Sequence, residues 1–209
     1  MSDTDDPMLG LFPLGIVLLP GEVVPLHIFE ERYKKLIGER LEDGEFGIVL
    51  AEEDAVREAG TSARVVQLVE ELDDGQLNVL VQGLRRFRIL GVHEPEDPEA
   101  DYLRARVEFF HDVEPEASQV LHDAVLEVFG KMLTLMDVES PREPAGEGLL
   151  SFRLAAAVDF GTPLKQELLE SLSEEQRLET LLTVMTSLLP RLELRKEREE
   201  AIRGNGKGY

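Results

Sequence analysis

Cysteine is absent from the 209 residues of the chain, and no apolar run reaches the roughly 18 residues that a membrane-spanning helix needs. The lack of cysteine excludes disulfide bonds, thiolate zinc sites and cysteine nucleophiles. The first eight residues, MSDTDDPM, are acidic and polar, whereas a secretion signal begins with basic residues followed by an apolar segment. We therefore expect a cytoplasmic protein with no membrane partner.

Positive charge is scarce, because 22 Lys and Arg residues stand against 43 Asp and Glu residues, for a net charge of -21. Nucleic-acid binding takes much of its affinity from neutralised phosphates, and anionic membranes also attract basic residues. The charge balance therefore argues against a DNA or RNA partner. With 43% hydrophobic residues, the chain is long enough for one large domain or two small ones.

Catalytic and metal-binding motifs are also missing. Neither G-x-S-x-G nor S-x-x-K occurs, and the C-terminal GNGKGY lacks the spacing and the closing Ser or Thr of a phosphate-binding loop. Carboxylates are too numerous for a catalytic pair to be chosen. We expect no catalytic residue, cofactor or metal, since no metal-site spacing links the four histidines, which are His27, His93, His111 and His122.

Prolines interrupt the apolar segment FPLGIVLLPGEVVPLHIFEERY, residues 12–33. Each proline fixes φ and removes a backbone donor, so this segment cannot be one helix or a central strand. The pattern predicts extended pieces at 16–19 and 23–29. A helix should follow and end at Asp43-Gly44, with an inward apolar stripe of Phe29, Tyr33, Leu36, Ile37 and Leu41.

Alternating apolar and polar residues predict further strands. Residues 46–51 form one, and residues 63–72 and 76–90 form a hairpin with a bulge near Gly83. Residues 52–60 read as a polar connection, and residues 102–110 as the last strand. Several short strands around one helix predict a closed or nearly closed sheet.

Helical periodicity dominates from residue 115 onward. Thr162-Pro163 resembles an N-cap and first helical residue, and Ser173 with Gln176 forms a capping box. Pro190 should end or kink the last helix. These helices should form one bundle; they are expected at 116–136, 149–160, 164–172 and from 173 onward, with a Pro/Gly-rich loop at 140–148.

The segment at residues 12–33 resembles the opening of the N-terminal domain of Lon proteases. Further similar segments follow in the family's order: FGIVLA, Gly60-Thr61 with Ala63-Arg64-Val65, VQGLRRFRIL and PLKQELLESLSEEQRLETLL. The resemblance covers residues 11–189 and implies an α+β fold, in which an N-terminal PUA-like β pseudobarrel with one inserted helix precedes a C-terminal α-helical bundle. The implied division is a disordered tail at 1–8, the barrel at 9–113, the bundle at 114–203 and a flexible tail at 204–209.

In Lon proteases this region helps to recognise unfolded or tagged chains, while ATP hydrolysis and proteolysis belong to later domains. The resemblance is therefore to stand-alone bacterial members, and it implies a non-catalytic module that binds unfolded or apolar protein segments, working with a protease or chaperone system. Two alternatives remain open, a small hydrolase with an unrecognised site and an RNA-binding PUA-like protein. The oligomeric state is not predicted.

The candidate peptide-binding residues fall into two groups and one isolated position. Leu80 interrupts the polar face of its strand, and an exposed apolar residue there could contact another chain. Alternation should place Arg86 and Arg88 on one face, opposite Phe87, as a site for an acidic group. The remaining candidates begin the first helix and could rim a groove; they are Glu30, Arg32 and Tyr33. The charged segment 192–203 is predicted to be a solvated helix or a docking helix.

Overall fold

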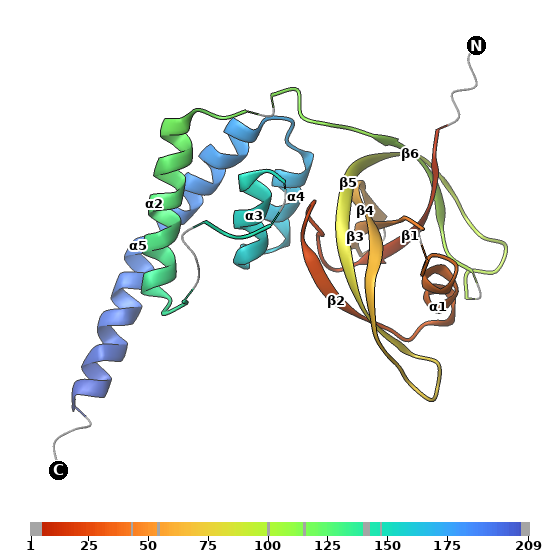
Figure 1. Cartoon of the computed structure of the whole chain (residues 1–209), viewed down its shortest axis with the longest axis horizontal. Coiled ribbons are helices and arrows are strands. Elements are labelled where there is room, and N and C mark those ends of the chain that lie inside the picture. Colours follow the sequence, from red (N-terminus) through yellow and green to blue (C-terminus); the bar gives the residue numbers. More distant parts are fainter. Residues whose placement is uncertain are drawn as a thin grey trace. The chain divides into compact units, whose positions relative to one another are not determined.

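The computed structural model describes residues 6–42, 44–53, 55–99, 101–114, 116–139, 143–146 and 148–205, with the backbone alone for 203–205. The described chain has an α+β fold (Figure 1). Its elements, in chain order, are β1 (Met8–Leu14), β2 (Val23–Ile28), α1 (Glu31–Gly38), β3 (Phe46–Glu52), β4 (Ala55–Glu71), β5 (Leu77–His93), β6 (Arg104–Phe109), α2 (Gln119–Leu135), α3 (Leu150–Ala157), α4 (Thr162–Glu170) and α5 (Glu174–Asn205).

Two compact units divide the chain. The first, called the sheet unit, comprises Met1–His111 with Asp159–Glu170, and the second, called the helical unit, comprises Asp112–Val158 with Ser171–Tyr209. The sequence had predicted a single boundary between residues 113 and 114. The division differs because the short helix α4 belongs with the strands rather than with the other C-terminal helices.

The sheet is mixed, with the strand order β2-β5-β4-β3-β1-β6, and β5 also pairs with β6. This extra pairing closes the sheet on itself, since its sixth strand contacts its second. Only β1 and β3 run parallel among the described pairs, and the others are antiparallel. One core cluster contains the buried face of α1 and the inward residues of β5; it includes Leu36, Ile37, Phe46, Val79 and Val81. A second contains Leu11, Phe87 and Val107.

The strand at residues 46–51 and the long hairpin are confirmed, whereas the predictions for residues 16–19 and 52–60 differ from the structure. Residues 16–19 do not form a strand, although Val17, Leu18 and Leu19 are buried. Residues 55–60 are not a connection, because β4 already begins at Ala55. The predicted irregularity near Gly83 is present, since β5 advances three residues between its pairs with Thr61 and Ala63 while β4 advances two.

Helix α1 is shorter than its predicted apolar stripe. Tyr33, Leu36 and Ile37 are buried, as expected, but Phe29 precedes the helix and is 60% exposed. Leu41 follows the helix and is also exposed. Both residues were wrongly assigned to the core, because the stripe was extended beyond the eight residues that are helical. The predicted end at Asp43-Gly44 lies partly outside the described residues.

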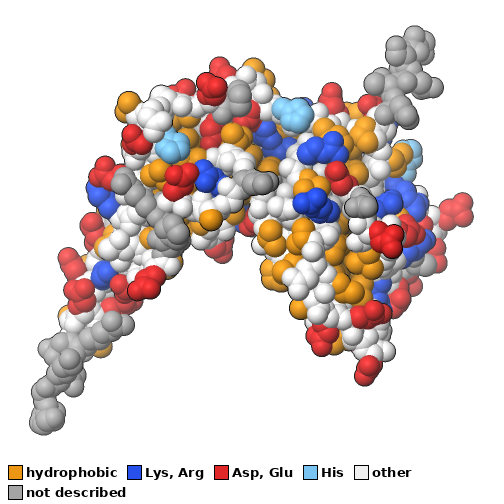
Figure 2. Space-filling model, in the orientation of Figure 1, with side chains coloured by type: hydrophobic (Ala, Val, Ile, Leu, Met, Phe, Trp, Pro, Cys, Tyr) orange, Lys and Arg blue, Asp and Glu red, His pale blue; other side chains and the backbone are white. Residues whose placement is uncertain are grey.

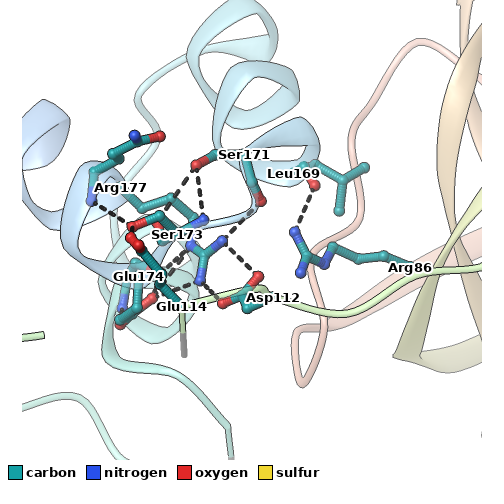
Figure 3. Close-up of polar contacts among 10 residues, drawn as sticks. Arg86, Asp112, Glu114, Leu169, Ser171, Ser173, Glu174 and Arg177 are labelled. Carbon is teal, nitrogen blue, oxygen red and sulfur yellow. Dashed lines mark hydrogen bonds and ion pairs between the residues drawn. The ribbon is translucent and has the colours of Figure 1, made fainter. Parts of the chain in front are cut away.

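Helix α4 is fixed to the strands by polar contacts that span long stretches of sequence. The Lys165 ammonium lies 2.6 Å from a carboxylate oxygen of Glu22, and both side chains are largely buried. The guanidinium of Arg86 donates to the carbonyl of Leu169 at 3.0 Å (Figure 3). These contacts explain why residues 159–170 fold with the sheet.

The helical unit packs α2 and α3 against α5. Val125, Phe129 and Met132 form the buried face of α2, whereas Val120 is 81% exposed just after the helix begins. Pro190 does not end α5, which continues to Asn205. None of the described helices combines the length and apolar character needed to cross a bilayer.

The predicted tails and loop are only partly described. Residues 1–5 and 206–209 lie outside the described part of the chain, as do residues 140–142 and 147 of the predicted loop. Met8, which was assigned to the N-terminal tail, begins β1 and pairs with Arg106. Gly204 and Asn205, which were assigned to the C-terminal tail, end α5.

Candidate functional site

An apolar surface lies on the outward side of strands β2, β5 and β4. Val24 and Leu26 of β2, Val79 and Val81 of β5 and Val65 of β4 belong to or pack on the core, so their alternate neighbours on β2 and β5 face outward. On β4, Val66 is the extra residue of a bulge and is exposed. We define the outer apolar face as Val23, Pro25, Val66 and Leu80. Val23 is 49% exposed and Val66 is 43% exposed. Hydrophobic side chains gather over this part of the sheet in Figure 2.

Strand register brings Leu80 to the middle of this face. Leu80 pairs with Pro25 on one side and with Gln67 on the other. Its neighbours along β5, Asn78 and Gln82, are polar and carry hydrogen bonds to His27 and Arg64. The half-buried Leu80 therefore joins the exposed valines of the outer strands. Exposed apolar residues continue along β4 at Leu68 and Val69.

Strand β2 forms the edge of the sheet at this surface, because its described pairing is with β5 alone. Pro25 lies in the middle of β2 and cannot donate a backbone hydrogen bond. A proline at a sheet edge hinders the edge from pairing with a further strand. The geometry thus favours side-chain contacts on the outer apolar face over strand addition at β2.

Glu30 and Arg32 pair with each other at the start of α1. Two guanidinium nitrogens of Arg32 donate to Oε2 of Glu30 at 3.0 and 2.6 Å, and a third nitrogen lies 3.3 Å from the carbonyl of Pro98. The ionic partner of Arg32 among the described residues is therefore Glu30. Both side chains are partly exposed, so this pair contributes at most about 1 kcal/mol to stability.

Tyr33 belongs to the core rather than to a groove. It is 7% exposed, and its ring centroid lies 4.2 Å from that of Phe12. Burial raises the pKa of the Tyr33 phenol, while the nearby positive charge of Arg32, whose guanidinium lies 4.6 Å from the ring centroid, acts in the opposite direction. Its part in binding remains a prediction, and the contacts assign it the role of supporting α1.

Arg86 and Arg88 share a face, as alternation predicts, since both guanidinium groups lie over the Phe110 ring at 4.7 and 5.5 Å from its centroid. Their environments differ. Arg86 is buried and binds the carbonyl of Leu169, whereas Arg88 is exposed. The intervening Phe87 is fully buried. Arg88 is therefore the member of this pair that another molecule can reach.

The sequence candidates do not assemble into one site. Glu30, Arg32 and Tyr33 lie together, Arg86 and Arg88 lie together, and Leu80 belongs to the outer apolar face. Sequence reasoning missed Val23 and Val66 as members of the outer apolar face. The alternation within 23–28 could have indicated Val23, but Val66 is the extra residue at a register shift between Val65 and Gln67, where simple alternation fails.

Metal ligands do not cluster in the part of the chain that the structure describes. No group of three or more His, Asp or Glu side chains there could hold an ion. His27, in β2, is exposed and lies 2.8 Å from Oδ1 of Asn78 through Nδ1.

Comparisons with a family model and with known sequences identify the same family. Residues 8–187 match the family described as the ATP-dependent protease La (LON) substrate-binding domain. The chain is 31% identical to the Lon protease of Anaeromyxobacter dehalogenans over 219 aligned positions, which cover 94% of this chain and 25% of the relative. It is also 31% identical to Lon protease 2 of Myxococcus xanthus, covering 94% and 26%. The chain thus spans about a quarter of these relatives.

Solved structures agree in fold. A Lon N-terminal domain protein from Xanthomonas campestris superposes with a TM-score of 0.67 at 26% identity, covering 85% of this chain and 98% of the other. The N-terminal domain of a Lon protease from the Mycobacterium avium complex gives a TM-score of 0.61 at 19% identity, with 86% and 98% covered. The second similarity concerns the fold alone.

Proposed function

Because the chain belongs to the family of Lon substrate-binding domains, we propose that it is a non-catalytic recognition module for unfolded or apolar segments of other proteins. The observation that carries this proposal is the outer apolar face on β2, β5 and β4, where Val23 and Val66 are exposed on a sheet that also displays Leu80. Apolar side chains grouped on a rigid sheet offer a surface that an apolar segment can cover.

We further propose that the sheet unit is a PUA-like pseudobarrel and the helical unit a bundle, and that the module acts in the cytoplasm beside a separate protease or chaperone system. The chain spans about a quarter of its Lon relatives, and the match is to their substrate-binding part.

Binding at this face would be driven by the removal of apolar area from water. Each 100 Å² of apolar surface covered contributes about 2.5 kcal/mol before the costs of association are subtracted. The net charge of -21 also selects among protein segments by their charge, because strongly acidic segments are repelled while neutral or basic ones are not. The expected substrates are accordingly apolar, non-acidic and extended.

The test is fluorescence anisotropy with a labelled, permanently unfolded protein of low net charge, whose reduced cysteines are capped with neutral carbamidomethyl groups, and with apolar ten-residue peptides. Saturable binding is expected for the natural chain. The double variant Val23→Glu/Val66→Glu places two charges on the outer apolar face and should raise the Kd at least about tenfold, which corresponds to about 1.4 kcal/mol.

Val120→Glu is the matched control, because Val120 is 81% exposed on α2 in the helical unit. It makes the same chemical change outside the proposed face and should leave the Kd unchanged. Circular dichroism must show that all variants are folded. Equal binding by the double variant and the natural chain, or an equal loss with Val120→Glu, contradicts the assignment of the site, and no saturable binding to any probe contradicts the function.

A further inference from the structure

One stretch of β4 has a free edge. Strand β3 pairs with β4 at Ala55 and Val56, but the pairing of β4 with β5 ends at Ala59 opposite Arg88. Strand β5 continues to His93 along β6, which lies on its other edge, since Phe87 and Arg88 pair with β4 and with β6 at once. On this side, residues 55–58 therefore face no strand in the described part of the chain. In an extended strand, alternate residues direct their backbone N–H and C=O groups to this side.

A pocket of about 350 Å³ lies beside this edge, lined by Val56, Arg57, Glu58, Ala59, Arg88 and Glu170. Gln166 of α4 is bonded to two of these lining residues, since its Nε2 donates to the carbonyl of Ala59 at 3.2 Å and to Glu170 at 2.7 Å. Its buried Oε1 has no hydrogen-bond partner among the described residues. The size lies within the range of about 300–1,000 Å³ that is typical of ligand pockets.

Arg88 differs from the other arginines nearby. Arg57 donates to Glu52 at 2.7 Å, and Arg85 pairs with Glu45 at 2.9 Å. Arg88 forms no ion pair within the described residues, although Glu108 lies opposite it on β6, and its guanidinium lies 5.5 Å from the centroid of the Phe110 ring. An exposed guanidinium on the wall of a pocket, without a carboxylate partner, is suited to bind an anionic group from outside.

We infer that this pocket binds the C-terminal residues of an extended polypeptide, with the chain added as a strand along residues 55–58 and its terminal carboxylate on Arg88. The inference rests on the proposed function, since its ligand is also a protein segment. Because Arg88 lies opposite Ala59, a carboxylate there requires the added strand to run parallel to β4. Glu58 and Glu170 line the same pocket and oppose further negative charge, so the ligand carries one carboxylate on an otherwise uncharged end.

The experiment uses a fluorescein-labelled ten-residue peptide of alternating valine and threonine, with either a free or an amidated C-terminus. With the full-length natural chain, amidation should weaken binding on the order of tenfold. Arg88→Gln should weaken binding of the free acid by a similar factor and remove the difference between the two peptides. Arg85→Gln changes the same residue type three positions earlier, where the guanidinium already has a partner, and should retain the difference.

Amide chemical shifts in ¹⁵N spectra locate the contact. The free acid should perturb the amides of residues 55–58, and methylation of its last two backbone nitrogens should abolish that perturbation. Equal affinity for both peptides, or an Arg88→Gln variant that still prefers the free acid, overturns the inference. If binding then depends on Val23 and Val66, the proposed function stands without it; if neither peptide binds and unfolded protein does not bind either, both fall.

Discussion

At the scale of single residues, the most constrained side chain is Arg177 of α5, which is fully buried. Its guanidinium pairs with the carboxylates of Asp112 and Glu174 and donates to the carbonyl of Ser171 (Figure 3). It also donates to the hydroxyl of Ser151, which in turn donates to Glu174. One arginine thus joins α5, α3 and the segment that precedes α2. Such a network is stable only while every member keeps its partners.

Arg177→Met removes the positive charge and leaves the two buried carboxylates without it. The free energy of unfolding should fall by about 3–5 kcal/mol, as found when one partner of a buried ion pair is deleted. Urea unfolding followed by circular dichroism measures the loss. Lys131→Met breaks an exposed pair with Glu127 on α2 and should cost less than about 1 kcal/mol. A similar small loss for both variants would show that the network contributes little.

The burial of a residue was predictable where it followed the apolar period of a helix or strand. It was unpredictable where it depended on contacts with residues distant in the sequence. The period placed Leu36, Ile37 and Val79 in the core. It could not separate Arg86, which reaches a carbonyl 83 positions away, from Arg88, which is exposed. Arg177 lies in a run of charged residues that reads as solvated. Its burial depends on Asp112, 65 positions earlier.

At the scale of elements, the sequence located most strands and helices but not their ends. Residues 16–19 have an apolar strand-like composition, yet side chains satisfy their backbone: Thr61 donates to the carbonyl of Leu18 at 2.6 Å, and Glu22 accepts from the amide of Leu19 at 2.9 Å. The start of β4 was missed because its small and polar residues show no clear alternation. Local patterns do not reveal a hydrogen bond such as that from Thr61, which lies 43 positions from Leu18.

The close approach of Leu19 to β5 explains why a glycine is found at position 83. Gly83 exchanges backbone hydrogen bonds with the turn, accepting from Gly21 and donating to Glu22, both at 2.9 Å. A Cβ atom there would lie 2.3 Å from the carbonyl oxygen of Leu19. Because the obstacle is backbone, it cannot move aside as a flexible side chain can. This contact fixes the turn onto the strand that carries Leu80.

Gly83→Ala should therefore lower the free energy of unfolding by about 1–3 kcal/mol, the range for overpacked sites. Gly38→Ala is the matched control, since a Cβ at the last residue of α1 meets nothing within 4 Å. That change should be neutral or stabilise by up to about 1 kcal/mol. Thermal and urea unfolding of both variants give the comparison. A Gly83→Ala protein as stable as Gly38→Ala would mean that the turn shifts without cost.

At the scale of the whole chain, the path between the two units is interleaved. The chain completes six strands, enters the helical unit, returns to the sheet unit as α4, and then leaves again. The sequence suggested one boundary because residues 115–205 share helical periodicity. The placement of α4 depends on contacts such as Lys165 with Glu22, 143 positions apart, which a periodic pattern cannot express. A single cut cannot separate the two units.

The net charge of -21 is also a property of the whole chain, and it should make stability depend on salt. Like charges repel more strongly in the compact state, and salt reduces this repulsion because the Debye length falls from about 30 Å at 0.01 M to about 3 Å at 1 M. The urea midpoint should rise between 0.02 M and 0.5 M NaCl, by an amount worth on the order of 1 kcal/mol.

A variant with fewer charges separates repulsion from other effects of salt. Glu71, Glu94 and Glu96 are exposed and have no ion-pair partner among the described residues, so their replacement by Gln removes three negative charges without breaking a pair. This triple variant should be more stable than the natural chain at 0.02 M NaCl and should gain less from added salt. A midpoint that falls with salt in the natural chain would mean that ion pairs such as Lys165 with Glu22 outweigh the repulsion.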